Sequence, residues 1–224
     1  DFEGTWEGDN GRWSESFGEL DFRSFDGLSN LQDFGVVFDA LASAREEILI
    51  ESAYLTFPFF AHLRAAARRG VRVSLIAPRI NNMPIMNAYV RWEAWRSRIP
   101  LHLYPDRMIH LKALLIDGKE LWIGSANFDF VSVRCEQELL CRVRDADLIR
   151  AFRERVLDPD RARSPIHAGP GSPLTGMACH LLLRLADVLI AGVEALVHRR
   201  GIRPSRGRRQ SSVSGRITGR ETTP

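Results

Sequence analysis

The chain has 224 residues, 45% hydrophobic and 26% charged, which is ordinary for a soluble globular protein and enough for one core-bearing domain plus extensions. Its three cysteines lack the spacing of a metal site and suit a reducing compartment. The net charge of +3 is uneven, because residues 199–224 hold eight Arg and one Glu, a net of +7, which leaves −4 on residues 1–198. This acidic body argues against nucleic acid as a partner, since nucleic-acid-binding domains normally show a basic face.

The beginning of the chain predicts little regular structure. Residues 1–28 are rich in Gly, Ser, acidic and aromatic residues without a helical or strand period, so we expect an irregular lead-in or linker. The chain opens on Asp1 and shows no signal peptide there, which favours a piece of something longer. From Ser29 to Glu47 the apolar residues recur at helical spacing and predict a first helix.

Strands and helices then alternate, which predicts a layered α/β sheet. Each expected helix carries apolar residues at helical spacing, and each expected strand is a short and largely apolar run. The expected strands are 48–54, 71–77, 101–104 and 138–143, and the expected helices are 59–69, 83–97 and 146–156.

The stretch from Met108 to Glu138 has the most constrained pattern of polar residues. Two short apolar strands flank Asp117-Gly118, a strong hairpin turn signal. His110 and Lys112 are two residues apart on the first of these strands and should project from the same face. An imidazole beside an ammonium suits a phosphate, because Lys112 would neutralise non-bridging oxygens while His110 attacks phosphorus or protonates a leaving oxygen.

Gly124, Ser125 and Asn127 follow the second strand, and the two polar side chains would add neutral donors to the same phosphate. A single His on a strand is usually packed in a core, and Asp-Gly is usually only a turn. The full spacing of His-x-Lys-x4-Asp-x6-Gly-Ser-x-Asn is much harder to obtain by chance. The Asp, Glu and His residues of this stretch do not have the spacing of metal ligands, so we expect phosphoryl chemistry without a metal or other cofactor.

This pattern resembles the HKD signature of the phospholipase D superfamily, and within it the branch of cardiolipin synthases and bacterial phospholipase D-like proteins. The resemblance implies a covalent phosphohistidine intermediate formed without a metal. It also implies site residues at the matching positions. The catalytic residues would be His110, Lys112 and Asp117, and the ligands of the substrate phosphate would be Lys112, Ser125 and Asn127.

The resemblance continues beyond this core. Glu138 stands where the family places an acidic residue that orients a catalytic His. The segment from Ser52 to Leu55 stands where the family has a Thr-Pro-Tyr-Phe-like segment after the first strand. The sequence departs from the family at Val131-Ser132, where Arg-Ser is common, and at Glu136, where Asn is common. These departures concern substrate detail rather than the core motif.

The resemblance implies a layered α/β/α domain with a mixed sheet over residues 29–160, and it covers about Leu31 to Pro159. The family builds one site from two motifs, one His acting as nucleophile and the other as general acid, whereas this sequence contains one motif. The second motif would come from a homodimer partner or from a preceding half of a longer protein. The start on Asp1 favours the longer protein, and the family pattern then gives His110 the acid–base role.

After a linker at residues 161–171, residues 172–200 predict a long amphipathic helix, and residues 201–224 a disordered Arg-rich tail. The polar residues of this helix fall on one narrow stripe, His180, Arg184, Asp187, Glu194 and His198. The helix is long enough to span a bilayer, but each charge of the stripe would cost about 2.5–3.5 kcal/mol inside it. Lying in a membrane interface and packing against protein both remain open.

Three functions follow from these features. The leading hypothesis is a phosphatidyltransferase or phospholipase D-type phosphodiesterase, resembling cardiolipin synthase, that acts on a phospholipid at the cytoplasmic side of a membrane. Residues 172–200 and the basic tail would bind that membrane, where anionic lipid attracts arginine. The alternatives are a homodimeric endonuclease and an inactive half-domain that serves as a membrane-attached module.

Overall fold

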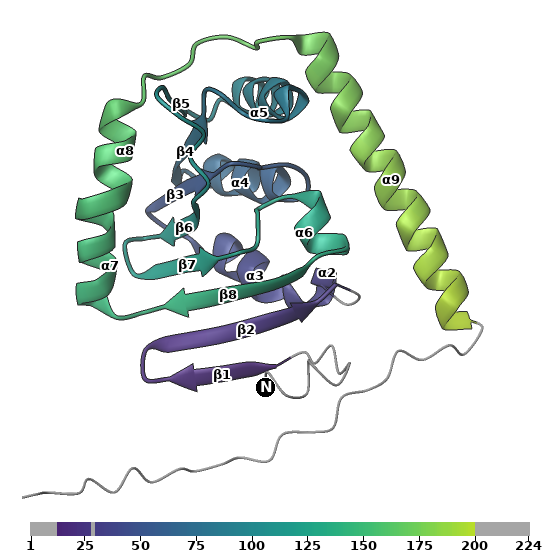
Figure 1. The fold of residues 1–224 in the computed structure, drawn as a ribbon, viewed down its shortest axis with the longest axis horizontal. Coiled ribbons are helices and arrows are strands. Elements are labelled where there is room, and N and C mark those ends of the chain that lie inside the picture. The colour runs from purple at the N-terminus through teal and green to yellow at the C-terminus, as the bar shows by residue number, and fades with distance from the viewer. Residues whose placement is uncertain (1–12, 28–29, 200–224) are drawn as a thin grey trace, which may run out of the picture.

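The computed structural model of the chain describes residues 13–27 and 30–199. Within these residues one sheet of eight strands organises the fold, in the order β1-β2-β8-β7-β6-β3-β4-β5 (Figure 1). Strands β3, β4 and β5 run parallel, and the other neighbours pair antiparallel. The strands are β1 (Ser14–Phe17), β2 (Leu20–Asp26), β3 (Glu47–Ser52), β4 (Arg72–Pro78), β5 (Leu101–Tyr104), β6 (Lys112–Ile116), β7 (Glu120–Gly124) and β8 (Gln137–Val143).

Helices cover both faces of the sheet, which confirms the expected α/β/α layers and mixed sheet (Figure 1). Helices α3, α4 and α5 pack on one face, and α7 with its continuation packs on the other. The helices are α2 (Asn30–Asp33), α3 (Gly35–Ser43), α4 (Phe59–Arg68), α5 (Pro84–Ser97), α6 (Phe130–Arg134), α7 (Ala146–Phe152), a π-helical turn η1 (Arg153–Leu157), α8 (Asp158–Arg163) and α9 (Pro173–Arg199).

The central strands are apolar on both sides because both sides are covered. Successive residues of β3 enter different clusters: Ile48 and Ile50 pack with α3, α4 and α5, while Leu49 packs with Ile149 and Leu157 on the other face. A strand buried on one face only would have needed alternation of apolar and polar residues. The two clusters hold the central strands, and with them the motif on β6 and β7, in a fixed register.

The expectation of an irregular stretch over residues 1–28 is wrong for residues 14–26. Strands β1 and β2 form a hairpin, and β2 pairs with β8 from Leu20 opposite Val143 to Asp26 opposite Gln137. This hairpin lies at the edge of the sheet, where strands need few apolar residues. Its sequence is therefore mostly polar and lacks the alternation of apolar and polar residues that would predict a strand. Phe25 anchors it, since its ring is buried and stacks on Phe34 at 4.6 Å between centroids. Residues 1–12 lie outside the described residues.

Other boundaries differ in smaller ways. The helix expected at 29–47 is divided at Phe34 into α2 and α3. The helix expected at 146–156 continues through η1 and α8 to Arg163, because Pro159 lies in the first turn of α8, where a missing N–H is tolerated. The linker at 161–171 therefore begins later than expected. Helix α9 agrees closely with the expected 172–200, and the tail at 201–224 lies outside the described residues.

Candidate active site

The motif lies at one end of the central strands. The parallel strands β3, β4 and β5 have their carboxyl ends on this side of the sheet, and here β6 begins and β7 ends (Figure 1). Lys112, the first residue of β6, pairs with Ser52, the last of β3. Gly124, the last of β7, pairs with Leu140 of β8. Sites in open α/β sheets commonly form at the carboxyl ends of parallel strands, so this position suits a functional site.

His110 precedes β6 rather than lying on it, so the expectation that it shares a strand with Lys112 is wrong in detail. The two side chains still meet. The Lys112 Nζ lies 3.0 Å from His110 Nδ1 and 3.2 Å from Nε2, and it donates to the His110 carbonyl oxygen at 3.0 Å. Nearly equal distances to both ring nitrogens place the ammonium over the face of the imidazole. Both edges of the ring therefore stay available for a reacting group.

Burial and charge tune this pair. His110 is exposed, yet partial desolvation and then the Lys112 ammonium lower the pKa of its imidazole. Lys112 is buried, and burial lowers its pKa while the carboxylates of Glu138, Asp129 and Glu136 oppose that shift. The arrangement favours a neutral imidazole beside a cation, which is the state that can attack phosphorus or accept a proton.

Tyr54 forms a wall beside His110, and the sequence pattern had not assigned it a role. Its ring meets the imidazole edge to face, with 6.3 Å between centroids. Its hydroxyl donates to Asn82 Oδ1 at 2.5 Å, and Ser52 Oγ donates to the Tyr54 carbonyl oxygen at 2.6 Å. The segment after β3, which the resemblance had matched to a Thr-Pro-Tyr-Phe-like segment, thus limits where the imidazole can turn.

Gly124 and Ser125 fix the second side of the site. A Cβ on Gly124 would lie 2.0 Å from the Leu139 carbonyl oxygen, so only glycine lets β7 approach β8 this closely. Ser125 Oγ donates to Glu138 Oε2 at 2.5 Å and accepts from the Leu139 N–H at 2.9 Å. The hydroxyl is thus already engaged within the chain, and its expected contact with a substrate phosphate stays a prediction.

Ser132 is the centre of this hydrogen-bond network, although the sequence pattern marked it only as next to a departure from the family. Its Oγ lies 2.8 Å from Glu138 Oε1 and 3.0 Å from Glu136 Oε2, and it accepts from the Asn127 N–H at 3.1 Å. Its own N–H donates to Asp129 Oδ1 at 2.9 Å, the cap of the short helix α6. The Asp129-x-x-Ser132 spacing is the signal that could have revealed this cap.

Three carboxyl groups therefore cluster near the Lys112 ammonium. Burial raises the pKa of Asp129 to about 6 against the opposing bonds from Ser132. Burial also raises the pKa of Glu138. The hydrogen bonds from the Ser125 and Ser132 hydroxyls oppose this shift, and the neighbouring Glu136 adds to it. Asp129 and Glu138 therefore gain a proton at a higher pH than ordinary carboxyl groups. Glu138 was expected to orient a histidine. Within this chain its carboxylate is hydrogen-bonded to the hydroxyls of Ser125 and Ser132 instead.

Asp117 is not brought together with His110 and Lys112, and its assignment as a catalytic residue stays a prediction. It lies at the opposite end of β6, where its carboxylate accepts from the N–H groups of Arg45, Glu46 and Glu47 at 2.9, 2.8 and 2.9 Å. Its backbone has a positive φ of 52°, as the hairpin turn requires. The spacing of the motif had suggested proximity, but a strand separates its two ends.

Residues 13–27 and 30–199 contain no group of three or more His, Cys, Asp or Glu side chains that could hold a metal ion. The expected metal-free chemistry stays a prediction. Asn127 adds one unused polar atom to the site, because its Oδ1 is buried without a hydrogen-bond donor among these same residues. Its expected role as a phosphate ligand is likewise untested.

The chain is similar in sequence to known proteins. Residues 37–157, more than half of the chain, match the family described as cardiolipin synthase, PLD-like domain. Cardiolipin synthase B of Escherichia coli K12 is 32% identical over 122 residues, which cover 52% of this chain and 29% of that protein. Cardiolipin synthase A of Serratia proteamaculans is 31% identical over 116 residues, covering 47% and 23%. The chain thus spans less than a third of the length of these curated relatives.

Solved structures share the fold. Nuc from Salmonella typhimurium, a phospholipase D family member, has a TM-score of 0.58 at 22% identity and is matched over 67% of this chain and 100% of its own. Phosphatidylserine synthase from Haemophilus influenzae Rd KW20 has a TM-score of 0.56 at 15% identity, with 76% and 47% covered. At these identities the likeness concerns the architecture of the sheet and its helices.

Proposed function

Because the chain belongs to the phospholipase D superfamily, in the family of cardiolipin synthase phospholipase D-like domains, we propose that it forms half of the active site of a phosphatidyltransferase or phospholipase D-type phosphodiesterase. The family is one of enzymes that transfer phosphatidyl groups or cleave phosphodiesters. The observation that carries the proposal is the exposed His110 imidazole held against the buried Lys112 ammonium. Its substrate would be a phospholipid.

The proposed reaction has two steps and a covalent intermediate. A nitrogen of one motif's imidazole attacks phosphorus, a P–N bond forms, and the P–O bond to the leaving alcohol breaks as that oxygen takes a proton from the other motif's imidazole. The second imidazole then removes the proton of an acceptor hydroxyl, whose oxygen attacks phosphorus while the P–N bond breaks. An alcohol as acceptor gives transfer, and water gives hydrolysis. Lys112 neutralises charge on the non-bridging oxygens throughout.

His110 takes the acid–base role in this proposal. The protonated ring donates to the leaving oxygen, a step that its lowered pKa makes easier, and the neutral ring that results accepts the proton of the acceptor hydroxyl in the second step. The second motif comes from another part of a longer protein or from a second copy. Glu138 can still orient the incoming imidazole. A carboxylate offers about four acceptor positions, and Ser125 and Ser132 use one on each oxygen. The site in this chain therefore has an acceptor ready for a ring N–H that a second motif would supply.

We place this enzyme at the cytoplasmic side of a membrane, where its substrate resides. Two features support this placement. One helix in the described part of the chain, Pro173–Val193, is long and apolar enough to cross a bilayer by length and composition. Cys135, Cys141 and Cys179 form no disulfide in the described part of the chain, which suits a reducing compartment.

The test replaces His110 by Ala in the intact protein that contains this chain and measures release of the alcohol head group from a phospholipid. Turnover should be lost while the unfolding temperature stays that of the wild type, because the exposed ring contributes little packing. His62→Ala serves as the control, since His62 lies on α4 and stacks on Phe38. Unchanged turnover in a folded His110→Ala protein would remove the catalytic assignment, and turnover of nucleic acid instead of lipid would favour the endonuclease.

A further inference from the structure

Helix α9 turns its apolar side outward. Eight large apolar side chains along its length are between 46% and 76% exposed, whereas soluble proteins rarely leave so many in one continuous patch. We call this set the outer face. It consists of Leu174, Met177, Leu181, Leu182, Leu185, Val188, Leu189 and Val193.

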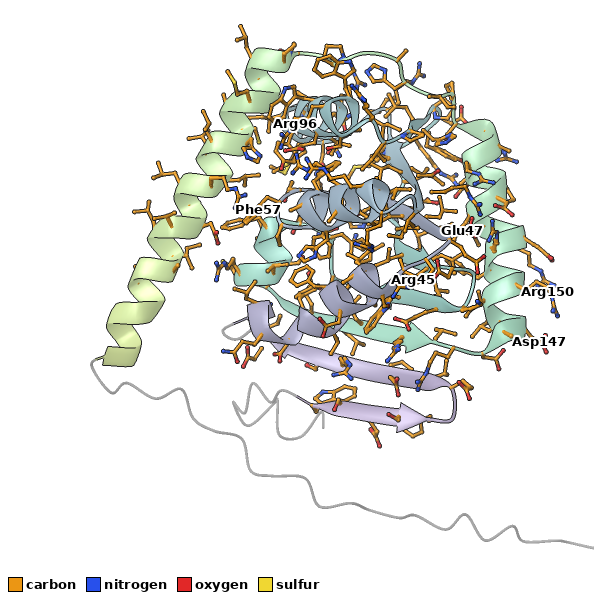
Figure 2. All side chains as sticks on the ribbon, turned by 180° about the vertical axis from the view of Figure 1, so that it is seen from behind. Arg45, Glu47, Phe57, Arg96, Asp147 and Arg150 are labelled. Carbon is orange, nitrogen blue, oxygen red and sulfur yellow. The ribbon has the colours of Figure 1, made fainter. Side chains whose placement is uncertain are left out.

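Three residues of the polar stripe of α9, His180, Arg184 and Asp187, contact the protein. Asp187 forms an ion pair with Arg134 of α6, and both side chains are mostly buried. His180 Nδ1 lies 3.0 Å from Glu93 Oε1 of α5. The Arg184 guanidinium lies 3.9 Å from the centre of the Phe57 ring, and Figure 2 shows Phe57 directed toward α9. These contacts fix the rotation of the helix and leave the outer face uncovered.

A basic hollow lies beside α9, at the carboxyl ends of α4 and α5. It has a volume of about 470 Å³, and its lining includes Arg64, Arg68, Arg96 and Arg98. Burial, then the charge of the neighbouring Arg96 and Arg68, lowers the pKa of Arg64, with Glu93 opposing. Arg96 is already paired with Glu93, at 2.8 Å between Nη2 and Oε1, so an anion in the hollow would meet Arg64, Arg68 and Arg98. Figure 2 shows Arg96 on the side of the molecule where α9 runs.

We propose that the outer face of α9 enters the surface of a bilayer and that the basic hollow binds the phosphate group of an anionic lipid in the same bilayer. The proposal rests on the proposed function for its lipid substrate, and it adds the orientation of the protein and the class of lipid. A helix of 27 residues extends about 40 Å, enough to bury the whole outer face in one plane.

Two other occupants fit less well. If α9 crossed the bilayer, its ion pair with Arg134 and its contact with Glu93 would draw α6 and α5 into hydrocarbon, where charges are costly. A second copy of this chain would bring another basic hollow toward the first, and like charges repel. An anionic lipid surface complements both the apolar face and the charge beside it.

The experiment measures sedimentation of the intact protein with phosphatidylcholine vesicles, with and without phosphatidylglycerol. All variants carry His110→Ala, so the outcome does not depend on turnover. Leu181→Glu with Leu185→Glu should weaken binding to both vesicles at least about tenfold, because two charges replace leucines that would enter the bilayer. Leu148→Glu is the control, since Leu148 is 48% exposed on α7, in the opposite layer.

Arg68→Gln with Arg98→Gln should weaken binding only to vesicles that contain phosphatidylglycerol, by about fivefold per arginine. The control is Arg150→Gln with Arg155→Gln, on the far side of the sheet, where Figure 2 places Arg150 away from α9. Equal losses in this control would overturn the hollow as a site. Unchanged vesicle binding by the Leu181 and Leu185 variant, or its conversion from dimer to monomer instead, would overturn the lipid as the occupant of the outer face.

Discussion

His110 and Lys112 set each other's charge because the ammonium lies over the ring. Adding a proton to His110 places two cations about 3 Å apart, which is why Lys112 contributes to the lowered pKa of the imidazole. The chain contains one other lysine, Lys119, which is exposed at the far end of β6 and pairs with Glu46. Replacing Lys119 therefore serves as the control for replacing Lys112.

Replacing Lys112 by Gln should raise the pKa of His110, since removal of a neighbouring cation favours the protonated ring. The imidazole would then begin to gain its proton at a higher pH than in the wild type. An NMR titration of the His110 ring protons measures this shift, and Lys119→Gln should leave it unchanged. Turnover should also fall by roughly 100-fold or more with Lys112→Gln, because charge on the phosphate is no longer neutralised. An unchanged or lowered pKa of His110 in the Lys112→Gln protein would contradict the contact between the two side chains.

The hydrogen bonds of Asp117 favour a structural role for this residue. Burial acts to raise the pKa of its carboxyl, but the N–H groups of Glu46, Glu47 and Arg45, with Lys119, together lower it. A lowered pKa means that the charged form stabilises the fold above the ordinary value near 3.9 and that this stabilisation disappears as the pH falls through the lower folded value. The motif's aspartate would thus act on the loop before β3.

Asp117→Ala should lower the free energy of unfolding at pH 7 by about 1–3 kcal/mol, because three backbone donors lose a charged acceptor that is partly open to solvent. Asp117→Asn should cost less, since Asn keeps one acceptor and tolerates the positive φ of 52°. Urea unfolding measures both. Turnover per folded molecule should stay near the wild type in Asp117→Asn, and its loss in a stable protein would return Asp117 to the catalytic group.

At the scale of elements, the docking of α9 can be tested through two glycines of the same helix. A Cβ on Gly176 would lie 2.4 Å from Trp92 Cβ, and Trp92 is itself held between His180 and Arg96. A Cβ on Gly192 would meet nothing within 4 Å. The same substitution should therefore have opposite effects at the two positions.

Gly192→Ala should stabilise the helix by about 0.5–1 kcal/mol, the usual gain of Ala over Gly in a helix. Gly176→Ala should destabilise the docked helix by about 1–3 kcal/mol, because the added methyl group forces Trp92 and α5 to move. Hydrogen exchange along α9, together with thermal unfolding, reports both changes. Equal effects of one sign at the two sites would mean that α9 is not packed on α5 as described.

Elements with a strong period could be predicted, and those held by long-range contacts could not. Helix α4 and strand β4 have nearly the expected bounds because their apolar residues carry the pattern. The β1–β2 hairpin and the short helix α6 depend on partners far along the chain. Asn30, for instance, donates to the carbonyl oxygens of Ser132 and Glu136 more than 100 residues away. No local window contains that information.

The same limit applies to the site and to the molecule as a whole. Spacing selected His110, Lys112 and Ser125, and the family resemblance added Glu138. The fold brings these four residues to the same end of the central strands, and their roles stay predictions. Spacing also grouped Asp117 with them, because a sequence pattern does not show which end of a strand a residue occupies. The amphipathic pattern of α9 revealed two faces of the helix but not which one meets the protein, which depends on Arg134 and Glu93 in other helices.

At the scale of the whole molecule, the second motif can come from the same polypeptide or from a second copy. The chain contains one motif and covers 29% of the length of cardiolipin synthase B, so a second motif in the same longer polypeptide is the arrangement we expect. The two arrangements differ in how turnover depends on the fraction of wild-type chains in a mixture with inactive chains. A symmetric dimer needs two intact copies to form one site.

Cells that produce the intact wild-type protein and its His110→Ala variant in several ratios provide the measurement, with the ratio in the purified protein determined by mass spectrometry. With both motifs in one polypeptide, each wild-type chain keeps a complete site, so turnover should fall in proportion to the wild-type fraction. With motifs from two copies, turnover should follow the square of that fraction and reach about a quarter at equal amounts. Mixing the wild type with His62→Ala should leave turnover unchanged at every ratio. A quadratic decline would contradict our expectation and assign the second motif to a homodimer partner.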